Sequence, residues 1–114
     1  MGAFAIGNVV LVEFPYSDYL NFKKRPALII GLADFDNYIL CQITSKKFPS
    51  RWAISLTRSN FVKDSLQLDS FIKPDKIYTV EALIIDRLVG RVSANKMAEV
   101  RRGLARLFEL DKNL

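Results

Sequence analysis

Residues 26–45 read PALIIGLADFDNYILCQITS and carry the strongest secondary-structure signal in the chain. Residues 26–33 are apolar on both faces of a strand, which predicts a central strand buried on both sides. Residues 34–37 have the composition of a turn, and residues 38–45 return to a β-branched, apolar pattern. The stretch therefore predicts a β-hairpin.

Short strands are predicted on both sides of this hairpin, at residues 8–14, 52–56, 66–73, 77–80 and 88–92, with a loop over 15–24 and a helical turn over 81–85. Pro74 cannot donate to a β ladder, which predicts a bulge or an edge position there.

The last element, residues 93–110, has helical periodicity. Its apolar residues fall on one face, with Ser93 in position to cap the helix, and comprise Met97, Val100, Leu104, Leu107 and Phe108. The predicted fold is mainly β (α+β), a small curled antiparallel sheet or barrel closed by a C-terminal amphipathic helix.

Composition indicates a single domain spanning residues 1–114 in a cytoplasmic protein. No linker or low-complexity tract interrupts the chain, and half of its residues are hydrophobic. No apolar stretch is long enough to span a bilayer, and the N-terminus lacks the cationic start of a signal peptide. The single cysteine, Cys41, lies in an apolar run, which predicts a buried thiol in a reducing compartment.

Positive charge is concentrated in the middle of the sequence. The chain has 17 Lys and Arg against 12 Asp and Glu, a net charge of +5. Residues 23–76 hold ten of the cations and five of the acids, and the remaining residues hold seven of each. This distribution favours a local field for a polyanion, although a solvated face that aids solubility is the alternative.

The predicted hairpin brings two cationic clusters together. If it closes across residues 34–37, paired positions sum to about 71–73. One end of the sheet then collects Lys23, Lys24, Arg25, Thr44, Ser45, Lys46 and Lys47. This grouping predicts an anion site on a rigid platform. Lysines that guard a strand end against edge pairing are the alternative interpretation.

A second group of charged residues lies in DSFIKPDK, residues 69–76. A bulge at Pro74 would separate Lys73 from Asp75, with Lys76 beside them. A carboxylate near cations stays ionised, and so could orient a hydroxyl or accept its proton. Asp75 is equally consistent with an ordinary turn residue after proline.

Missing residue types narrow the possible chemistry. The chain has no histidine, which excludes histidine acid–base pairs and Ser–His–Asp triads, and one cysteine without histidine excludes the usual zinc sites. We therefore expect no metal and no cofactor. RNA cleavage remains possible with these residues because the substrate supplies its own nucleophile, the 2′-hydroxyl.

Taken together, several segments resemble the MazF/PemK family of toxin endoribonucleases over about residues 7–110: GNVVLVEF, KKRPALII, QITS, DSFIKPDK and GRVS before the helix. The resemblance implies an SH3-like curved antiparallel barrel with a C-terminal helix. It also implies a cytoplasmic homodimer that cuts single-stranded RNA without a metal and leaves a 2′,3′-cyclic phosphate. A cognate antitoxin would silence it, the antitoxin-bound complex is expected to bind DNA, and no membrane is involved.

The resemblance also implies site residues. Arg25 of the RP motif and Thr44 of the ITS motif would hold the scissile phosphate. Lys73 and Asp75 stand where one branch of the family has an arginine acid and an aspartate base, so lysine replaces arginine here. The RNA-binding residues would be Lys23, Lys24, Ser45, Lys46, Lys47 and Lys76. Tyr16 or Tyr19 would stack on a base in place of the histidine that some members carry.

Three other functions stay open. A purely structural interaction domain is one of them, although it would not need the clustered cations. The first of the other two is a catalytically inactive SH3-like module that binds nucleic acid through the same basic patch. The second is a gyrase poison of a related barrel fold, which depends on a Trp-Gly-Ile ending, whereas this chain ends Lys112-Asn113-Leu114.

Overall fold

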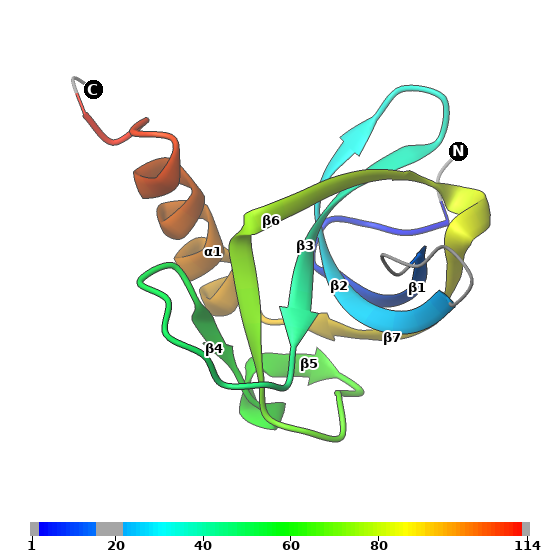
Figure 1. The fold of residues 1–114 in the computed structure, drawn as a ribbon, viewed down its shortest axis with the longest axis horizontal. Helices are drawn as coiled ribbons and strands as arrows, with labels where there is room; N and C mark the ends of the chain where they lie inside the picture. Colours follow the sequence, from blue (N-terminus) through cyan, green and yellow to red (C-terminus); the bar gives the residue numbers. More distant parts are fainter. Residues whose placement is uncertain (1–2, 16–21, 113–114) are drawn as a thin grey trace.

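The computed structural model describes residues 3–15 and 22–112, which form a curved, seven-stranded antiparallel sheet and a C-terminal helix (Figure 1). The strands are β1 (Asn8–Pro15), β2 (Phe22–Ala33), β3 (Asn37–Thr44), β4 (Ile54–Leu56), β5 (Phe61–Lys63), β6 (Ser70–Glu81) and β7 (Ile85–Val92). The helix is α1 (Ala94–Leu107), and two 3-10 turns are η1 (Arg58–Asn60) and η2 (Ala82–Ile84). The predicted curved sheet with a C-terminal helix is confirmed.

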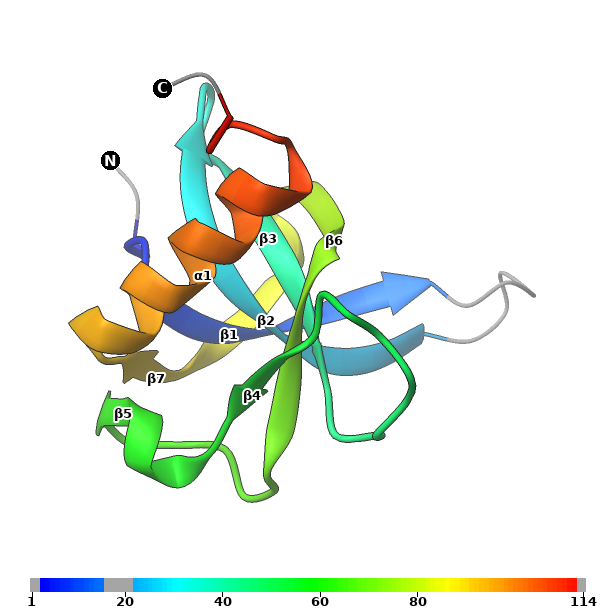
Figure 2. The same ribbon diagram turned by 90° about the vertical axis from the view of Figure 1, so that its left-hand side faces the viewer.

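The strands follow the order β4-β6-β3-β2-β1-β7-β5 across the sheet, and the sheet curls into a half-barrel (Figure 1). Its two faces bury separate apolar clusters. Leu28 packs in the cluster between the sheet and α1, while Ala27 and Ile29 pack in the cluster inside the curl. Figure 2 shows α1 lying across one side of the curved sheet. The prediction that the central strand is buried on both faces is therefore confirmed for residues 27–29, although Leu32 is exposed.

Helix α1 begins where the sequence predicts. The Oγ atom of Ser93 accepts a hydrogen bond from the backbone N–H of Lys96 at 3.1 Å, which caps the first turn. Met97 and Val100 are buried as expected. The expectation for Phe108 is wrong: the helix ends at Leu107, and the Phe108 side chain is 57% exposed.

Several boundaries differ from the prediction. Strand β2 begins at Phe22, so the loop predicted over residues 15–24 overlaps a strand in which Lys24 pairs with Glu13 of β1. Strand β6 is continuous over the two strands predicted at 66–73 and 77–80, and it starts only at Ser70. Pairing with β1 extends β2 back to Phe22, and pairing with β3 on both sides of Pro74 joins the two predicted strands into β6.

Candidate functional site

The β2–β3 hairpin closes more tightly than predicted. Its turn places Phe35 and Asp36 in the left-handed region, at φ 61° and 60°, and the N–H of Asn37 donates to the Asp34 carbonyl at 3.3 Å. Ala33 pairs with Asn37, a sum of 70. A register shift between Ile29 and Gly31 lowers this sum to 69 for the rest of the ladder. The predicted sum of 71–73 is therefore wrong.

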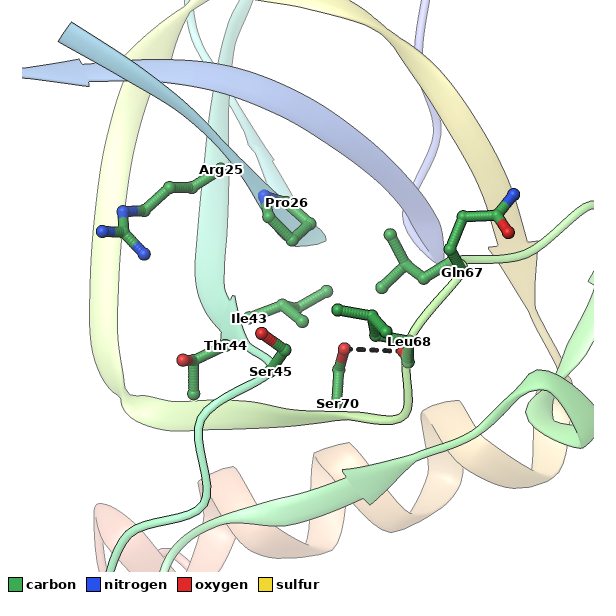
Figure 3. Close-up of a pocket in the computed structure, with 9 residues that line it drawn as sticks. Arg25, Pro26, Ile43, Thr44, Ser45, Gln67, Leu68 and Ser70 are labelled. Atoms are coloured by element: carbon green, nitrogen blue, oxygen red, sulfur yellow. Dashed lines mark hydrogen bonds between the residues drawn. The ribbon is translucent and has the colours of Figure 1, made fainter.

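The observed register brings Arg25 level with Thr44. Ala27 pairs with Gln42 at the end of the ladder, and the same register continued for two residues reaches Arg25 and Thr44. The predicted neighbours of Arg25 were Thr44, Ser45, Lys46 and Lys47. Thr44 and Ser45 line a cavity with Arg25, whereas the two lysines lie in the loop after β3 and line no part of it. Figure 3 shows the Arg25 and Thr44 side chains projecting to the same side of the two strands.

A cavity of about 270 Å³ adjoins this pair. Arg25, Thr44 and Ser45 line it, and Pro26 and Ile43 form an apolar wall between them (Figure 3). The rest of the lining comes from the loop between β5 and β6 and from the start of β6, namely Leu66, Gln67, Leu68 and Ser70. The cavity therefore combines one guanidinium and two hydroxyl groups with apolar side chains in its lining.

The hydroxyl of Thr44 is oriented by the chain that follows it. Its Oγ1 atom accepts a hydrogen bond from the backbone N–H of Lys46 at 3.1 Å. Because that bond uses a lone pair of the oxygen, the hydroxyl hydrogen remains available to donate to an anion. Arg25 is half-buried, and its planar guanidinium has the donor geometry that suits a phosphate.

Strand β6 carries the bulge that Pro74 predicts. Cys41 pairs with Ile77 and the next residue, Gln42, pairs with Lys73, so Pro74, Asp75 and Lys76 are left over in β6. Pro74 is fully buried, and a Cβ atom placed on Gly103 of α1 would lie 3.9 Å from its Cγ atom. The bulge is therefore held against the helix.

Neither of the two predicted proton-transfer residues, Lys73 and Asp75, lines the cavity. Lys73 lies opposite Gln42, on the same sheet face as Thr44 and diagonal to it. Its Nζ atom is 4.5 Å from the ring centroid of Phe48, a cation–π contact. Asp75 is exposed. Burial is the larger cause that raises the pKa of the Cys41 thiol, and the nearby Asp75 carboxylate raises it further.

The remaining predicted RNA-binding residues are spread around this end of the sheet. Lys23, Lys24, Ser45, Lys46, Lys47 and Lys76 are exposed. The Nζ atom of Lys24 also lies 3.4 Å from a carboxylate oxygen of Asp86. Tyr16 and Tyr19 lie outside the described residues.

Sequence reasoning missed two contributors to this region. Leu66, Gln67 and Leu68 were assigned to a strand because their alternation reads as one, yet they form the loop that closes the cavity. The contact between Phe48 and Lys73 was not predicted, because nothing in the local sequence indicates that this ring would meet that lysine.

Within residues 3–15 and 22–112, no group of three metal-binding side chains comes together. In that same part of the chain, no helix has the length and apolar character needed to cross a bilayer.

The fold is that of MazF-like proteins. An endoribonuclease from a mycobacterial species, solved with its cognate antitoxin, superimposes with a TM-score of 0.75 at 18% identity, over 95% of this chain and 97% of that one. The toxin MazF-mt6 from Mycobacterium tuberculosis gives 0.71 at 17% identity, over 90% and 96%. MazF from Deinococcus radiodurans, solved as a MazE-MazF complex, gives 0.72 at 19% identity, over 91% and 94%.

The sequence itself settles the family. The model of the PemK-like, MazF-like toxin of type II toxin-antitoxin systems matches residues 5–108, so the chain belongs to this family. No curated protein matches the chain.

Proposed function

We propose that this protein is a metal-independent endoribonuclease toxin that cuts single-stranded RNA at a phosphate held by Arg25 and Thr44. The observation that carries the proposal is the placement of these two side chains on neighbouring strands beside one cavity. Family membership supports the toxin role, and solved relatives named as endoribonucleases support the reaction.

The proposed reaction is an internal transesterification. The ribose 2′-oxygen attacks the adjacent phosphorus, the bond from phosphorus to the 5′-oxygen breaks, and the products are a 2′,3′-cyclic phosphate and a 5′-hydroxyl. The 2′-hydroxyl loses one proton and the leaving oxygen gains one, so no water or cofactor is consumed. The protein supplies orientation, charge stabilisation and proton transfer.

Arg25 and Thr44 stabilise the phosphate in this proposal. The guanidinium offers two parallel N–H donors to the non-bridging oxygens, whose negative charge increases in the transition state. Thr44 donates its hydroxyl hydrogen to the same group, because the N–H of Lys46 already holds its oxygen. In this proposal Arg25 stabilises charge on the phosphate, and proton transfer is assigned to other residues.

Proton transfer is assigned to two residues of β6, one in the bulge and one beside it. Asp75 accepts the proton of the 2′-hydroxyl, and Lys73 donates one to the leaving 5′-oxygen. The support is the register, which sets Lys73 diagonal to Thr44 on one sheet face. To donate this proton, the Lys73 ammonium group either moves away from the Phe48 ring or keeps its cation–π contact with that ring during the step.

Partners follow from the family. We propose a cytoplasmic homodimer that a cognate antitoxin silences, with the toxin–antitoxin complex binding DNA. Two relatives are solved with an antitoxin, the mycobacterial endoribonuclease and the Deinococcus radiodurans MazF. Phe35 is 96% exposed and Leu83 is 91% exposed, and the N–H of Ala82 donates to the Asp36 carbonyl at 3.3 Å. Two large, exposed apolar side chains therefore lie on either side of the contact between Ala82 and the tip of the β2–β3 hairpin. This exposed apolar surface supports a protein interface there.

The products test the proposal. Single-stranded RNA incubated with the protein in excess EDTA is expected to give fragments with 5′-hydroxyl and 2′,3′-cyclic phosphate ends, and mass spectrometry identifies both. RNA with 2′-O-methyl groups should stay intact because its nucleophile is blocked. Salt-sensitive binding without any cleavage would favour the alternative of an inactive nucleic-acid-binding module.

A further inference from the structure

The wall of the cavity opposite Arg25 contains an exposed leucine. Leu68 lies in the loop between β5 and β6, and its side chain is 64% exposed although it lines the cavity. A leucine exposed to this degree adds little to the core, so most of its side-chain surface remains accessible at the cavity. An apolar side chain at the mouth of a cavity is suited to contact a bound ligand.

The loop around Leu68 is held at both ends. Leu66 packs against the buried cluster beneath α1. Ser70 is 4% exposed, and its Oγ atom donates a hydrogen bond to the Leu68 carbonyl at 2.9 Å (Figure 3). Because its neighbours on either side are fixed, Leu68 presents a preformed wall to whatever enters.

The opposite wall of the cavity is also apolar. Pro26 and Ile43 form it, and the hydroxyl of Ser45 lies at the same end as Thr44 (Figure 3). The volume of about 270 Å³ falls slightly below the range of pockets that hold drug-sized ligands. A flat ring of one or two cycles, apolar on its faces and polar at its edge, fits these walls.

We propose that this cavity is a nucleobase subsite, and that Leu68 sets which base is accepted next to the cleaved phosphate. The inference rests on the proposed function, because Arg25 and Thr44 would hold the phosphate at the edge of the cavity. One face of the base contacts Leu68, the other contacts Pro26, and the Ser45 hydroxyl meets the edge of the base. The loop between β5 and β6 then determines the preferred sequence.

Binding tests this subsite without cleavage. The probes are fluorescent 2′-O-methyl oligonucleotides, which cannot be cut. One homopolymer is made for each base. Each homopolymer is used intact and in versions that carry a single abasic site at each position in turn. For the preferred base, one abasic position should weaken binding to the wild-type protein by roughly tenfold. Leu68→Ala should bind the intact probe roughly tenfold more weakly and lose little more at the abasic position.

Leu110→Ala is the matched control, because Leu110 is 58% exposed beyond the end of α1 and lines no part of this cavity. It should give the wild-type pattern. Ser70→Ala removes the bond to the Leu68 carbonyl, and with an unchanged melting temperature it should reduce the abasic penalty in the same direction as Leu68→Ala.

The outcomes separate the two proposals. Equal abasic penalties for wild-type protein and Leu68→Ala at every position would overturn the base subsite, whether or not the protein cuts RNA. If the penalties differ as expected but natural RNA stays intact in EDTA, the subsite stands and the nuclease proposal fails. If the protein does cut, sequencing of the 5′ ends should show a broader preference for Leu68→Ala at one position beside the cut.

Discussion

Arg25 of β2 and Thr44 of β3 lie on neighbouring antiparallel strands, and both line one cavity. The ladder between the two strands ends at the Ala27–Gln42 pair, two residues away from each of them. Both side chains are carried by strands rather than by loops. This rigid relationship is the basis of the proposed phosphate site.

The Thr44 hydroxyl can be tested separately from the fold. Thr44→Val keeps the shape of the side chain but removes the donor to the phosphate. We expect the cleavage rate to fall by roughly 10- to 100-fold, the size of a hydrogen bond to a charged group. Thr44→Ser keeps the donor and should stay within a few-fold of wild type. Equal rates for Val and Ser would show that the hydroxyl has no role in the reaction.

Lys73 stands where related toxins are expected to carry arginine. Lys73→Met should lower the cleavage rate by about 10²- to 10⁴-fold, the range for loss of a general acid, and single-turnover kinetics would measure it. Lys63→Met on the exposed strand β5 controls for the loss of one positive charge. A Lys73→Met enzyme as fast as this control would exclude Lys73 from proton transfer.

Cys41 gives a prediction about pH and stability. Burial, and then the nearby Asp75 carboxylate, raise the pKa of the thiol from 9.0 to about 12. The folded protein therefore holds this proton more tightly than the unfolded chain. The stabilisation is complete below pH 9 and is lost as pH rises towards 12.

Cys41→Val removes this titration while keeping an apolar side chain of similar size. Between pH 9 and the folded-state pKa, the free energy of unfolding of the wild type should fall relative to the variant by up to about 1.4 kcal/mol per pH unit. Urea titrations at several pH values measure the difference. Parallel pH profiles for the two proteins would contradict the burial of the thiol.

Gly90 allows β7 and the β5 segment to approach closely. A Cβ atom at this position would lie 2.7 Å from the Lys63 carbonyl oxygen and 3.1 Å from Cδ2 of Phe61. Because a backbone atom must move, Gly90→Ala should lower the free energy of unfolding by roughly 1–3 kcal/mol, measured by urea denaturation. Gly31→Ala is the control, since its nearest contact would be an ordinary 3.5 Å from Ile39, and it should be neutral or slightly stabilising.

The sequence predicted the architecture because its strongest signals are local. Alternating apolar runs, the helical stripe after Ser93 and the proline at position 74 each act within a few residues of the element they specify. The curved sheet, the capped helix and the bulge on β6 follow from them and are confirmed.

The register of the hairpin could not be predicted in the same way. Phe35 and Asp36 adopt left-handed backbone angles, which a phenylalanine disfavours and an aspartate only tolerates. The turn therefore carries no Asn-Gly signal. The register shift between Ile29 and Gly31 has no local signal either. Together they lower the sum of paired positions from the predicted 71–73 to 69 at the end of the ladder near Arg25.

Lys96 was missed for a related reason. A lysine off the apolar stripe is expected in solvent, yet Lys96 is 8% exposed, and its Nζ atom lies 2.7 Å from both the Ser55 carbonyl and a Glu99 carboxylate oxygen. Its burial depends on where β4 packs against the helix, which the local pattern does not contain.

The most direct measurement is the single-turnover rate of RNA cleavage in EDTA for wild type, Arg25→Ala and Arg102→Ala. Arg102 is an exposed helix residue outside the cavity, so its variant matches the loss of charge. We predict that Arg25→Ala loses at least about 10³-fold in rate while folding normally by circular dichroism, and that Arg102→Ala cuts like wild type. Cleavage by Arg25→Ala at the wild-type rate would contradict a phosphate site at this residue.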